Sequence, residues 1–337
     1  MAHIDFKTFI EEEQPKKVVL MHHWDTDGLA CAALFMNYLT KVSPQTEVVL
    51  MNPTINNYFL VKKEYEQVKK EKVEAVITTD INFPLLVIEN LEEIDSHVFV
   101  FDHHAQTENI DRPGVQNPAF PGCTMLVNEY LGNPLSLLAV LGMVGDQEDR
   151  IKKDETYFPK VEEVIGEEGL TFEQVLRISK LIDTTYMVGD VEGLHYAIEL
   201  LREDAKKALE DEKLLENEKR IKQEMDQELG KDMVEVAPAV LYLSIDSQMS
   251  LISEVTRARA RQFPDKVIVT DQVRGKDASL YVRRRDADVD LGAIVEYARK
   301  QGLNSGGKPE VAGVVLAADQ LDKFREEVMT ILKGLTA

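Results

Sequence analysis

Short apolar runs that end in acidic and histidine residues constrain this chain more than any other feature. Three runs are rich in β-branched and aromatic residues, which is typical of buried parallel strands: residues 18–21, 76–79 and 98–101. They lead into residues 22–28, 80 and 102–104, respectively. In an open α/β sheet, ligands bind beyond the carboxyl ends of the strands. The sequence therefore predicts that these polar residues meet at one sheet edge, where they can form a metal site.

The segments between these runs have helical patterns, densely apolar over residues 29–39 and amphipathic over residues 58–70. Alternating strand and helix signals predict a doubly wound α/β domain with a parallel sheet. Beyond residue 238 a second series of signals predicts a smaller α/β domain. Its expected strands cover residues 239–245, 266–270, 278–284 and 314–317.

The 337 residues exceed one ordinary hydrophobic core, so we expect two domains. Residues 199–231 are dense in Glu and Lys and lack proline, which predicts one long solvated connecting helix. We expect a first domain over residues 1–190, a helical connector over 191–235 and a second domain over 236–337.

The net charge of −21 argues against a protein that coats nucleic acid, because such binding depends on Lys and Arg. It does not exclude an enzyme with a local basic patch in a cleft. The two cysteines have no CxxC partner, which is typical of a reducing cytosol. No signal peptide and no membrane-spanning stretch are predicted, so we expect a cytoplasmic protein without membrane contact.

The clusters contain residues that suit divalent metals. His23, Asp25 and Asp27 combine imidazole with carboxylates, a donor set that favours Mn²⁺. Taken alone, Asp27 before Gly28 is also explained as a helix cap. However, four of the seven histidines form two doublets at strand ends, and Asp146 adds a further carboxylate. Their joint placement favours a metal site.

The motifs resemble those of the DHH phosphoesterase superfamily, which is named for its Asp-His-His signature. Its four motifs have counterparts here, in order: His23-x-Asp25-x-Asp27, Asp80, Asp102-His103-His104 and Gly145-Asp146. The family's C-terminal Gly-Gly-Gly-His-x-x-Ala-Ala-Gly loop is similar to residues 305–313, and the strand before it is similar to residues 279–283. The resemblance covers nearly the whole chain.

The resemblance implies a DHH catalytic domain, a DHH-associated substrate-binding domain and two divalent metals. The metals are typically Mn²⁺, with Mg²⁺ or Co²⁺ as substitutes. Asp80 would bridge them, with His23 and Asp25 on one side and Asp27, His103 and Asp146 on the other. Asp102 would orient an imidazole, and His104 would face the scissile phosphate. Two such metals activate a water that attacks phosphorus, so no protein nucleophile is needed.

The chain departs from the family pattern at two places. Some relatives have their first histidine four residues before the first aspartate, where this chain has Met21. The candidate here, His23, stands only two residues before Asp25. Lys308 stands where the family usually has histidine. The backbone N–H groups of Gly306 and Gly307 would cradle an anion, and Lys308 would add a point charge.

Two further residues are candidates for substrate contact. Arg283 would grip phosphate oxygens, because guanidinium binds them bidentately. Trp24 is a candidate to stack on a base.

The expected activity is that of a Mn²⁺-dependent phosphodiesterase (exonuclease) that releases nucleoside monophosphates from short single-stranded RNA or DNA oligonucleotides. The size resembles the nano-RNase (oligoribonuclease) or compact archaeal RecJ-like group. Three alternatives stay open: a phosphodiesterase for linear dinucleotides from cyclic dinucleotide signalling, a pyrophosphatase or exopolyphosphatase, and a RecJ-derived replisome scaffold. A homodimer and a replication-protein partner also stay open.

Overall fold

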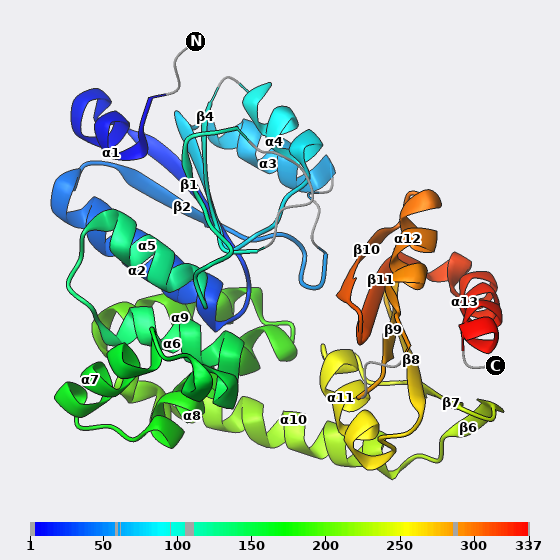
Figure 1. The fold of residues 1–337 in the computed structure, drawn as a ribbon. Helices are drawn as coiled ribbons and strands as arrows, with labels where there is room; N and C mark the ends of the chain where they lie inside the picture. Colours follow the sequence, from blue (N-terminus) through cyan, green and yellow to red (C-terminus); the bar gives the residue numbers. More distant parts are fainter. Residues whose placement is uncertain are drawn as a thin grey trace. The chain divides into compact units, whose positions relative to one another are not determined.

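The computed structural model describes residues 4–57, 60, 62–94, 96–104, 111–285 and 289–335. It divides the chain into two units, Met1–Glu218 and Lys219–Ala337, each with its own β-sheet (Figure 1). Within the described ranges, no helix has both the length and the apolar character needed to cross a bilayer.

The first unit is built on sheet A, whose described strands all run parallel in the order β2-β1-β3-β4-β5. The strands are β1 (Lys17–His22), β2 (Glu47–Met51), β3 (Ala75–Thr79), β4 (His97–Asp102) and β5 (Gly114–Gln116). From β1 the chain passes to β2 on one side, whereas β3, β4 and β5 follow on the other. The order therefore reverses between β1 and β3, the point where α/β sheets of this kind bind ligands.

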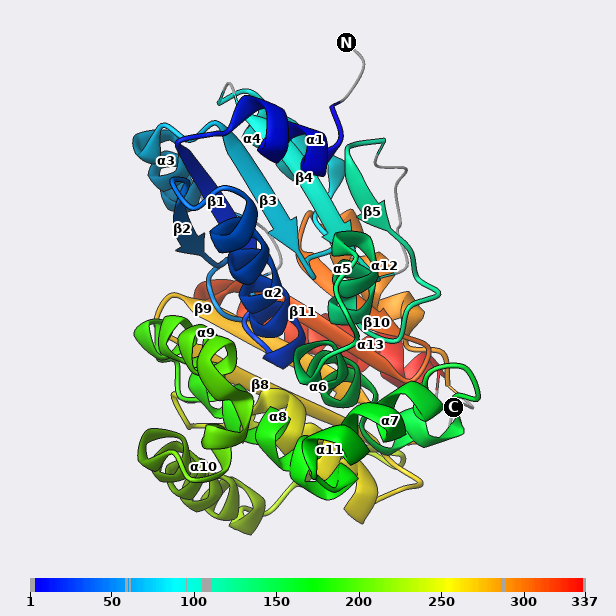
Figure 2. The same cartoon turned by 90° about the vertical axis from the view of Figure 1, so that its left-hand side faces the viewer.

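Helices cover both faces of sheet A (Figures 1 and 2). The helices α2 (Thr26–Val42) and α5 (Cys123–Leu131) share a core with one face, which includes Leu20 and Ile77. The helices α3 (Lys62–Glu71) and α4 (Leu85–Glu92) share a core with the other face, which includes Val19 and Val76. Because both faces are buried, the strands are apolar throughout. The predicted doubly wound parallel sheet is confirmed.

The rest of the first unit is helical. It contains α1 (Phe6–Thr8), a π-helical turn (Phe9–Glu13), α6 (Leu137–Gln147), α7 (Phe158–Glu168), α8 (Phe172–Met187) and α9 (Val191–Asp204), with short 3₁₀ segments at Glu148–Lys153 and Ala205–Leu209. The helix predicted over residues 58–70 corresponds to α3, and residues 58, 59 and 61 of that prediction lie outside the described ranges.

The predicted single solvated connector is wrong. Helix α9 ends at Asp204, and after the 3₁₀ segment a separate helix, α10, covers Glu212–Gly230. Leu194, Ile198 and Leu201 are buried in the core of the first unit. Their spacing of three and four residues forms an apolar stripe, which the dense charges on the other side of the helix concealed. The domain boundaries at residues 190 and 235 stay predictions.

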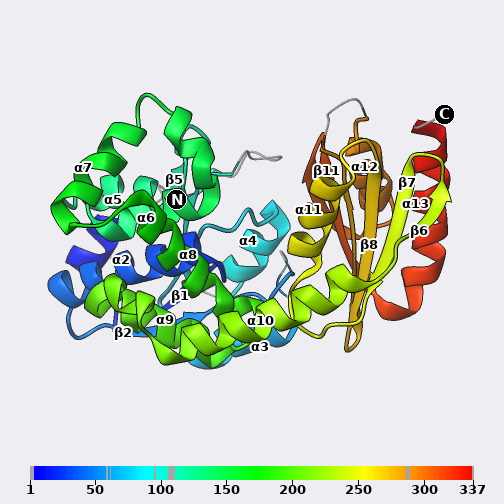
Figure 3. The same ribbon diagram turned by 90° about the horizontal axis from the view of Figure 1, so that it is seen from below.

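The second unit is built on sheet B, with strand order β10-β11-β9-β8-β7-β6. Strands β7 and β8 pair in parallel, whereas the other neighbouring strands of the described sheet pair antiparallel. The strands are β6 (Val234–Ala237), β7 (Val240–Ile245), β8 (Val267–Arg274), β9 (Asp277–Arg283), β10 (Asn304–Lys308) and β11 (Val311–Ala317). Helix α11 (Ile252–Gln262) lies on one side of the sheet, and α12 (Gly292–Lys300) and α13 (Leu321–Leu335) pack on the other (Figure 3).

The glycine-rich segment is a strand and not the predicted loop. Residues 304–308 form β10, which pairs with β11 so that Lys308 lies opposite Val311. A Cβ at Gly307 would lie 2.0 Å from the carbonyl oxygen of Val311, so this pairing requires glycine there. Glycine contributes no side chain to an apolar pattern, and the strand signal was therefore missing from the sequence.

Candidate metal centre

Three neighbouring strands of sheet A deliver predicted metal ligands to one edge. His23 follows β1, Asp80 follows β3, and His103 follows β4. The backbone N–H of His23 donates to the carbonyl of Thr79 (3.2 Å), and that of Asp80 donates to the carbonyl of Phe101 (2.9 Å). The strand pairing thus extends just past the strand ends, and it holds these residues side by side.

Asp80 has a backbone conformation that most residues avoid. Its φ of 60° lies in the left-handed region, where a non-glycine residue is uncommon, although aspartate is tolerated there more than most. Such conformations concentrate at functional sites, where the surrounding structure maintains them. The side chain is 2% exposed, so the conformation presents a buried carboxylate at the sheet edge.

The start of α2 positions two further carboxylates. Asp25 caps the helix, since its Oδ1 accepts from the backbone N–H of Gly28 (3.1 Å). The cap alternative that the sequence raised for Asp27 therefore applies to Asp25. Asp27 accepts instead from the backbone N–H groups of Cys123 (2.6 Å) and Thr124 (2.8 Å), in the first turn of α5. The helix N-terminus fixes its orientation and favours its negative charge.

Two glycines allow the backbone to approach these ligands closely. A Cβ at Gly142 of α6 would lie 2.0 Å from Oδ1 of Asp27, and a Cβ at Gly28 would lie 2.5 Å from Cβ of His23. Sequence reasoning did not single out Gly142, because nothing near it in the chain indicates that α6 packs against Asp27.

The structure brings all six predicted metal ligands together. Donor atoms within 4.8 Å of one another form three groups. Two match the predicted sets, His23 with Asp25 and Asp80, and Asp27 with His103 and Asp146, and the third joins Asp80 and His103 to His104. Asp80 links the groups, with Oδ2 3.7 Å from His23 Nδ1 and Oδ1 3.5 Å from His103 Nε2. His103 Nε2 also lies 3.1 Å from Asp146 Oδ2. The ligand role of each residue stays a prediction.

The donor atoms fit a divalent cation. Asp80 Oδ1 and His103 Nε2 are buried, and in the described part of the chain neither has an aligned hydrogen-bond partner. His103 Nδ1 lies 3.2 Å from the carbonyl of Phe120, which only accepts, so Nδ1 carries hydrogen and Nε2 is left to bind a metal. Buried polar atoms without partners are costly. A cation between them would remove that cost.

Negative charge accumulates at this edge. Burial and the charge of Asp146 raise the pKa of Asp27 to about 6. Burial and the charges of Asp27 and Asp25 raise the pKa of Asp80 well above its ordinary value. Burial alone would lower the pKa of His103, but the carboxylates of Asp146 and Asp27 raise it to about 9. The protein thus gathers more carboxylates than it can keep ionised alone, as metal sites commonly do.

Asp102 and His104 form a pair beside this cluster. Asp102 is fully buried, and its Oδ1 lies 2.7 Å from Nδ1 of His104. Burial favours the neutral carboxyl, but the hydrogen bond with His104 holds the pKa of Asp102 below its ordinary value. The His104 side chain is 46% exposed. This hydrogen bond orients an accessible imidazole. The catalytic roles of Asp102 and His104 stay predictions.

Sequence reasoning missed Asp183, on α8. Its Oδ1 accepts from the backbone N–H of Thr26 (2.8 Å) and from Thr26 Oγ1 (2.7 Å), between Asp25 and Asp27. Burial and the charge of Asp25 raise the pKa of Asp183 from 3.8 to about 7. Asp183 therefore holds the first turn of α2, which carries two predicted ligands. Its only sign in the sequence is a carboxylate next to the apolar stripe of α8.

The prediction that a base stacks on Trp24 is wrong. Trp24 is 3% exposed, and its ring packs on that of His23 with centroids 4.1 Å apart. The indole packs against a predicted ligand, His23, and its burial leaves no accessible ring face on which a base could stack.

The predicted substrate-binding residues lie together in the second unit. Arg283 is the last residue of β9, and Gly306, Gly307 and Lys308 belong to β10. Val311 of β11 lies opposite both Arg283 and Lys308, so the two cations share a row across three strands. Neither has an ion-pair partner among the described residues. Their contact with substrate stays a prediction.

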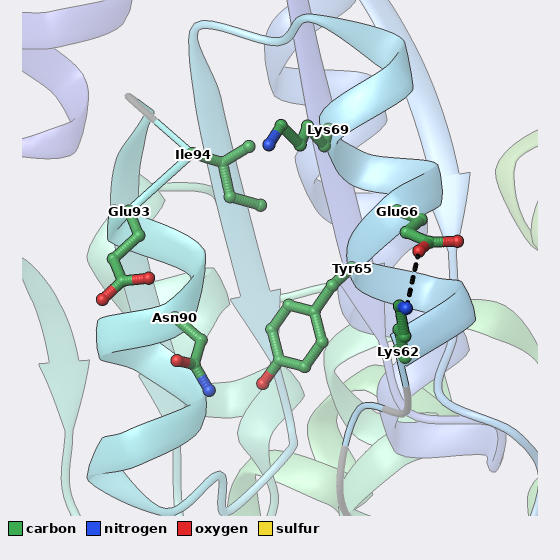
Figure 4. Close-up of a pocket in the computed structure, with 7 residues that line it drawn as sticks. All are labelled: Lys62, Tyr65, Glu66, Lys69, Asn90, Glu93 and Ile94. Atoms are coloured by element: carbon green, nitrogen blue, oxygen red, sulfur yellow. Dashed lines mark ion pairs between the residues drawn. The ribbon is translucent and has the colours of Figure 1, made fainter.

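A separate surface hollow of about 420 Å³ lies beside α3 and α4, with Tyr65 directed into the space between them (Figure 4). Its lining balances two lysines against two glutamates: Lys62, Tyr65, Glu66, Lys69, Asn90, Glu93 and Ile94. Lys62 and Glu66 pair with each other at 3.6 Å. None of the predicted site residues lines it, and its balanced charge indicates no class of ligand.

Both units match described domains. Residues 17–166 match the DHH family, N-terminal domain, and residues 237–334 match the DHHA1 domain. These matches place the protein among the α/β phosphoesterases, a class of hydrolases. It belongs to the DHH phosphoesterase superfamily, as the motifs indicated.

Individual relatives are distant. The single-stranded-DNA-specific exonuclease RecJ of Bacillus subtilis (strain 168) is 21% identical over 140 residues, which are 41% of this chain and 18% of that protein. The structure of RecJ from Thermus thermophilus in complex with Mn²⁺ has a TM-score of 0.68 at 18% identity, covering 95% of this chain and 52% of that one. The DHH domain of a protein from a family of ribosomal proteins has a TM-score of 0.69 at 18% identity, covering 95% and 88%.

This chain thus spans less than a fifth of the curated relative and about half of the Thermus protein. At these identities the solved structures show a shared fold.

Proposed function

We propose that this protein is a Mn²⁺-dependent phosphodiesterase that releases nucleoside monophosphates from short single-stranded oligonucleotides. The observation that carries the proposal is the complete set of six predicted ligands, gathered within two linked groups at the switch point of sheet A. A scaffold descended from such an enzyme would not need to keep every ligand, and its donor atoms would not need to stay grouped.

Each residue has a task in this proposal. His23 and Asp25 would hold one cation, Asp27, His103 and Asp146 would hold the other, and Asp80 would serve both. Cations in this carboxylate-rich site, Mn²⁺ or its substitutes Mg²⁺ and Co²⁺, would lower the pKa of a bound water and offset charge on phosphate.

The remaining residues bind and orient the substrate. Asp102 keeps hydrogen on Nδ1 of His104, so the exposed imidazole is directed at a phosphate oxygen. Arg283 and Lys308 bind a second phosphate, each with a cationic group that no acid of the described chain neutralises. In this assignment residues 1–190 form the catalytic domain and residues 236–337 the substrate-binding domain.

Two observations support a short nucleic acid as substrate. The net charge of −21 opposes binding along a long polyanion, which depends on many cations. The named relatives of similar fold include RecJ, an exonuclease specific for single-stranded DNA in Bacillus subtilis.

The test is hydrolysis of 5′-labelled RNA and DNA, from dinucleotides to about twenty nucleotides, with Mn²⁺ or with chelator. We expect metal-dependent loss of the shortest substrates, and the position of the label will give the polarity. Asp80→Ala should abolish turnover, because one carboxylate serves both groups. Asp154→Asn is the matched control, since Asp154 only caps a turn through the N–H groups of Thr156 and Tyr157.

Two outcomes would contradict the proposal. Retained Mn²⁺-dependent turnover in Asp80→Ala would show that the ligand assignment is wrong. Hydrolysis of pyrophosphate or polyphosphate with no cleavage of any oligonucleotide would instead move the substrate to the phosphoanhydrides.

A further inference from the structure

Tyr281 lies beside a bare strip of two glycines on one face of sheet B. Along β9, Leu280 and Val282 are buried against the core with α12 and α13, so Tyr281 lies on the opposite face, the one on which α11 packs over β7 and β8, and there it is half-buried. Across the sheet, Tyr281 pairs with Gly313 of β11, and Gly313 pairs with Gly306 of β10.

The glycines leave this part of the face flat. A Cβ at Gly313 would lie 3.2 Å from Cδ2 and Cε2 of Tyr281, so the ring leans over Gly313. A Cβ at Gly306 would meet nothing within 4 Å. Gly306 therefore leaves room for at least a small group at an exposed position of an edge strand.

Cationic groups flank this strip. Arg283 and Lys308 lie two residues further along β9 and β10, which places them on the same face in the next row. Same-face rows of a sheet are about 7 Å apart. An aromatic ring with a flat strip beside it and two cations one row away is a surface that matches a nucleotide, whose planar base and charged phosphate are separated by a sugar.

We propose that the Tyr281 ring, which leans over Gly313, stacks against a nucleobase that extends over Gly306, while a phosphate of the same nucleotide binds Arg283 and Lys308. This inference rests on the proposed oligonucleotide substrate, and it adds the residue that distinguishes a nucleotide from a bare phosphate chain. Polyphosphate would use the two cations but gain nothing from the ring. A purely structural cross-strand pair of Tyr281 with Gly313 would need neither the bare Gly306 nor the cations.

The test compares Tyr281→Leu with Tyr281→Phe, which keeps the aromatic face. Binding of a dinucleotide that contains 2-aminopurine is followed by its fluorescence in the presence of chelator, and the KM and kcat of hydrolysis are measured with Mn²⁺. Stacking of one base predicts at least about fivefold weaker binding for Tyr281→Leu and a matching rise in KM, with kcat within about twofold. Tyr281→Phe should stay within about twofold of the wild type, and an abasic dinucleotide should bind both variants equally.

Gly306→Val provides an independent variant. Valine suits a strand, and a Cβ at this position would meet nothing within 4 Å, so the melting temperature should not fall. Its side chain would occupy the strip, and dinucleotide binding should weaken at least as much as in Tyr281→Leu.

The possible failures are distinguishable. Equal weakening of the base-containing and abasic ligands by Tyr281→Leu, or a lower melting temperature with unchanged binding, would overturn the stacking role. If the wild type hydrolyses no oligonucleotide, the proposed function fails, but the 2-aminopurine measurement still tests whether a base stacks on Tyr281. Quenching that Tyr281→Leu abolishes would support it, and absence of quenching in the wild type would refute it.

Discussion

Replacing Asp183 by asparagine should make the metal-free protein more stable at alkaline pH. Asparagine keeps an oxygen that accepts from the N–H and hydroxyl of Thr26, at the positions where Oδ1 now accepts at 2.8 and 2.7 Å. It removes a carboxyl whose ionised form is disfavoured by burial and by the charge of Asp25. The substitution therefore separates the hydrogen bonds of Asp183 from its charge.

The size of the effect follows from the pKa. The pKa of Asp183 rises from 3.8 in the unfolded chain to about 7 in the fold. Between these values the native state binds more protons than the unfolded state, so stability falls as the pH rises. One pKa unit corresponds to about 1.4 kcal/mol, so the cost is roughly 1.6 kcal/mol at pH 5 and about 4 kcal/mol at pH 8. An asparagine at this position would not carry this cost, because its amide does not ionise.

Urea unfolding in the presence of chelator, at pH 5 and pH 8, measures the difference directly. We expect the advantage of Asp183→Asn over wild type to grow by roughly 2–3 kcal/mol between the two pH values. Asp154→Asn is the control, because Asp154 also accepts from two backbone N–H groups but is half-exposed. Its effect should stay within about 0.5 kcal/mol at both pH values.

The same variant should bind Mn²⁺ less tightly, because it removes negative charge near the predicted ligands. Trp24 is the only tryptophan of the chain and packs on His23, so its fluorescence can report metal binding without turnover. The reasoning would be refuted if the stability of Asp183→Asn differed from that of the wild type by the same amount at pH 5 and pH 8. It would mean that the charge of Asp183 is not disfavoured in the fold.

Three further predictions concern the site and its metal. Gly142→Ala would place a Cβ 2.0 Å from Asp27 Oδ1, so we expect the free energy of unfolding to fall by about 1–3 kcal/mol. In thermal scans, Mn²⁺ should no longer raise the melting temperature of this variant. Gly166→Ala is the control, because a Cβ there would meet nothing within 4 Å. Mn²⁺ at a hundred times its Kd should stabilise the wild type by about 2.7 kcal/mol, and an unchanged melting temperature would argue against a preformed site. Lys308→Ala should raise KM more than it lowers kcat, whereas a fall confined to kcat would exclude a role in binding substrate.

Three of the predicted ligands could be found from sequence because each one closely follows a strand. His23, Asp80 and His103 come immediately after short apolar runs, or within two residues of one, and parallel strands place their carboxyl ends on one edge whatever the details of packing. The grouping therefore depends on topology, which the alternation of strand and helix patterns already indicates. Asp25 and Asp27 lie at the same edge because they stand at the start of the helix that follows β1.

Predictions from local sequence were wrong where composition did not reveal how a segment packs in the fold. The dense charges that begin at residue 199 drew attention from the stripe of Leu194, Ile198 and Leu201, which packs in the core of the first unit. The glycines of β10 have no side chains to alternate, so the hairpin with β11 resembled a loop. Trp24 was taken for a binding residue because a large aromatic near a site suits either a ligand or the core, and only burial decides between them.

Asp183 and Gly142 show which part of the site no local pattern can contain. Asp183 contacts Thr26 from 157 residues away, and Gly142 limits the space around Asp27 from another helix. Neither residue belongs to one of the four motifs, since Asp183 lies within a helix that follows them and Gly142 has no side chain. Their effect arises only when α6 and α8 pack against the start of α2. If the predictions for Asp183→Asn and Gly142→Ala hold, α6 and α8 help to determine how strongly the site binds metal. Yet these two helices contribute only one predicted ligand, Asp146 of α6.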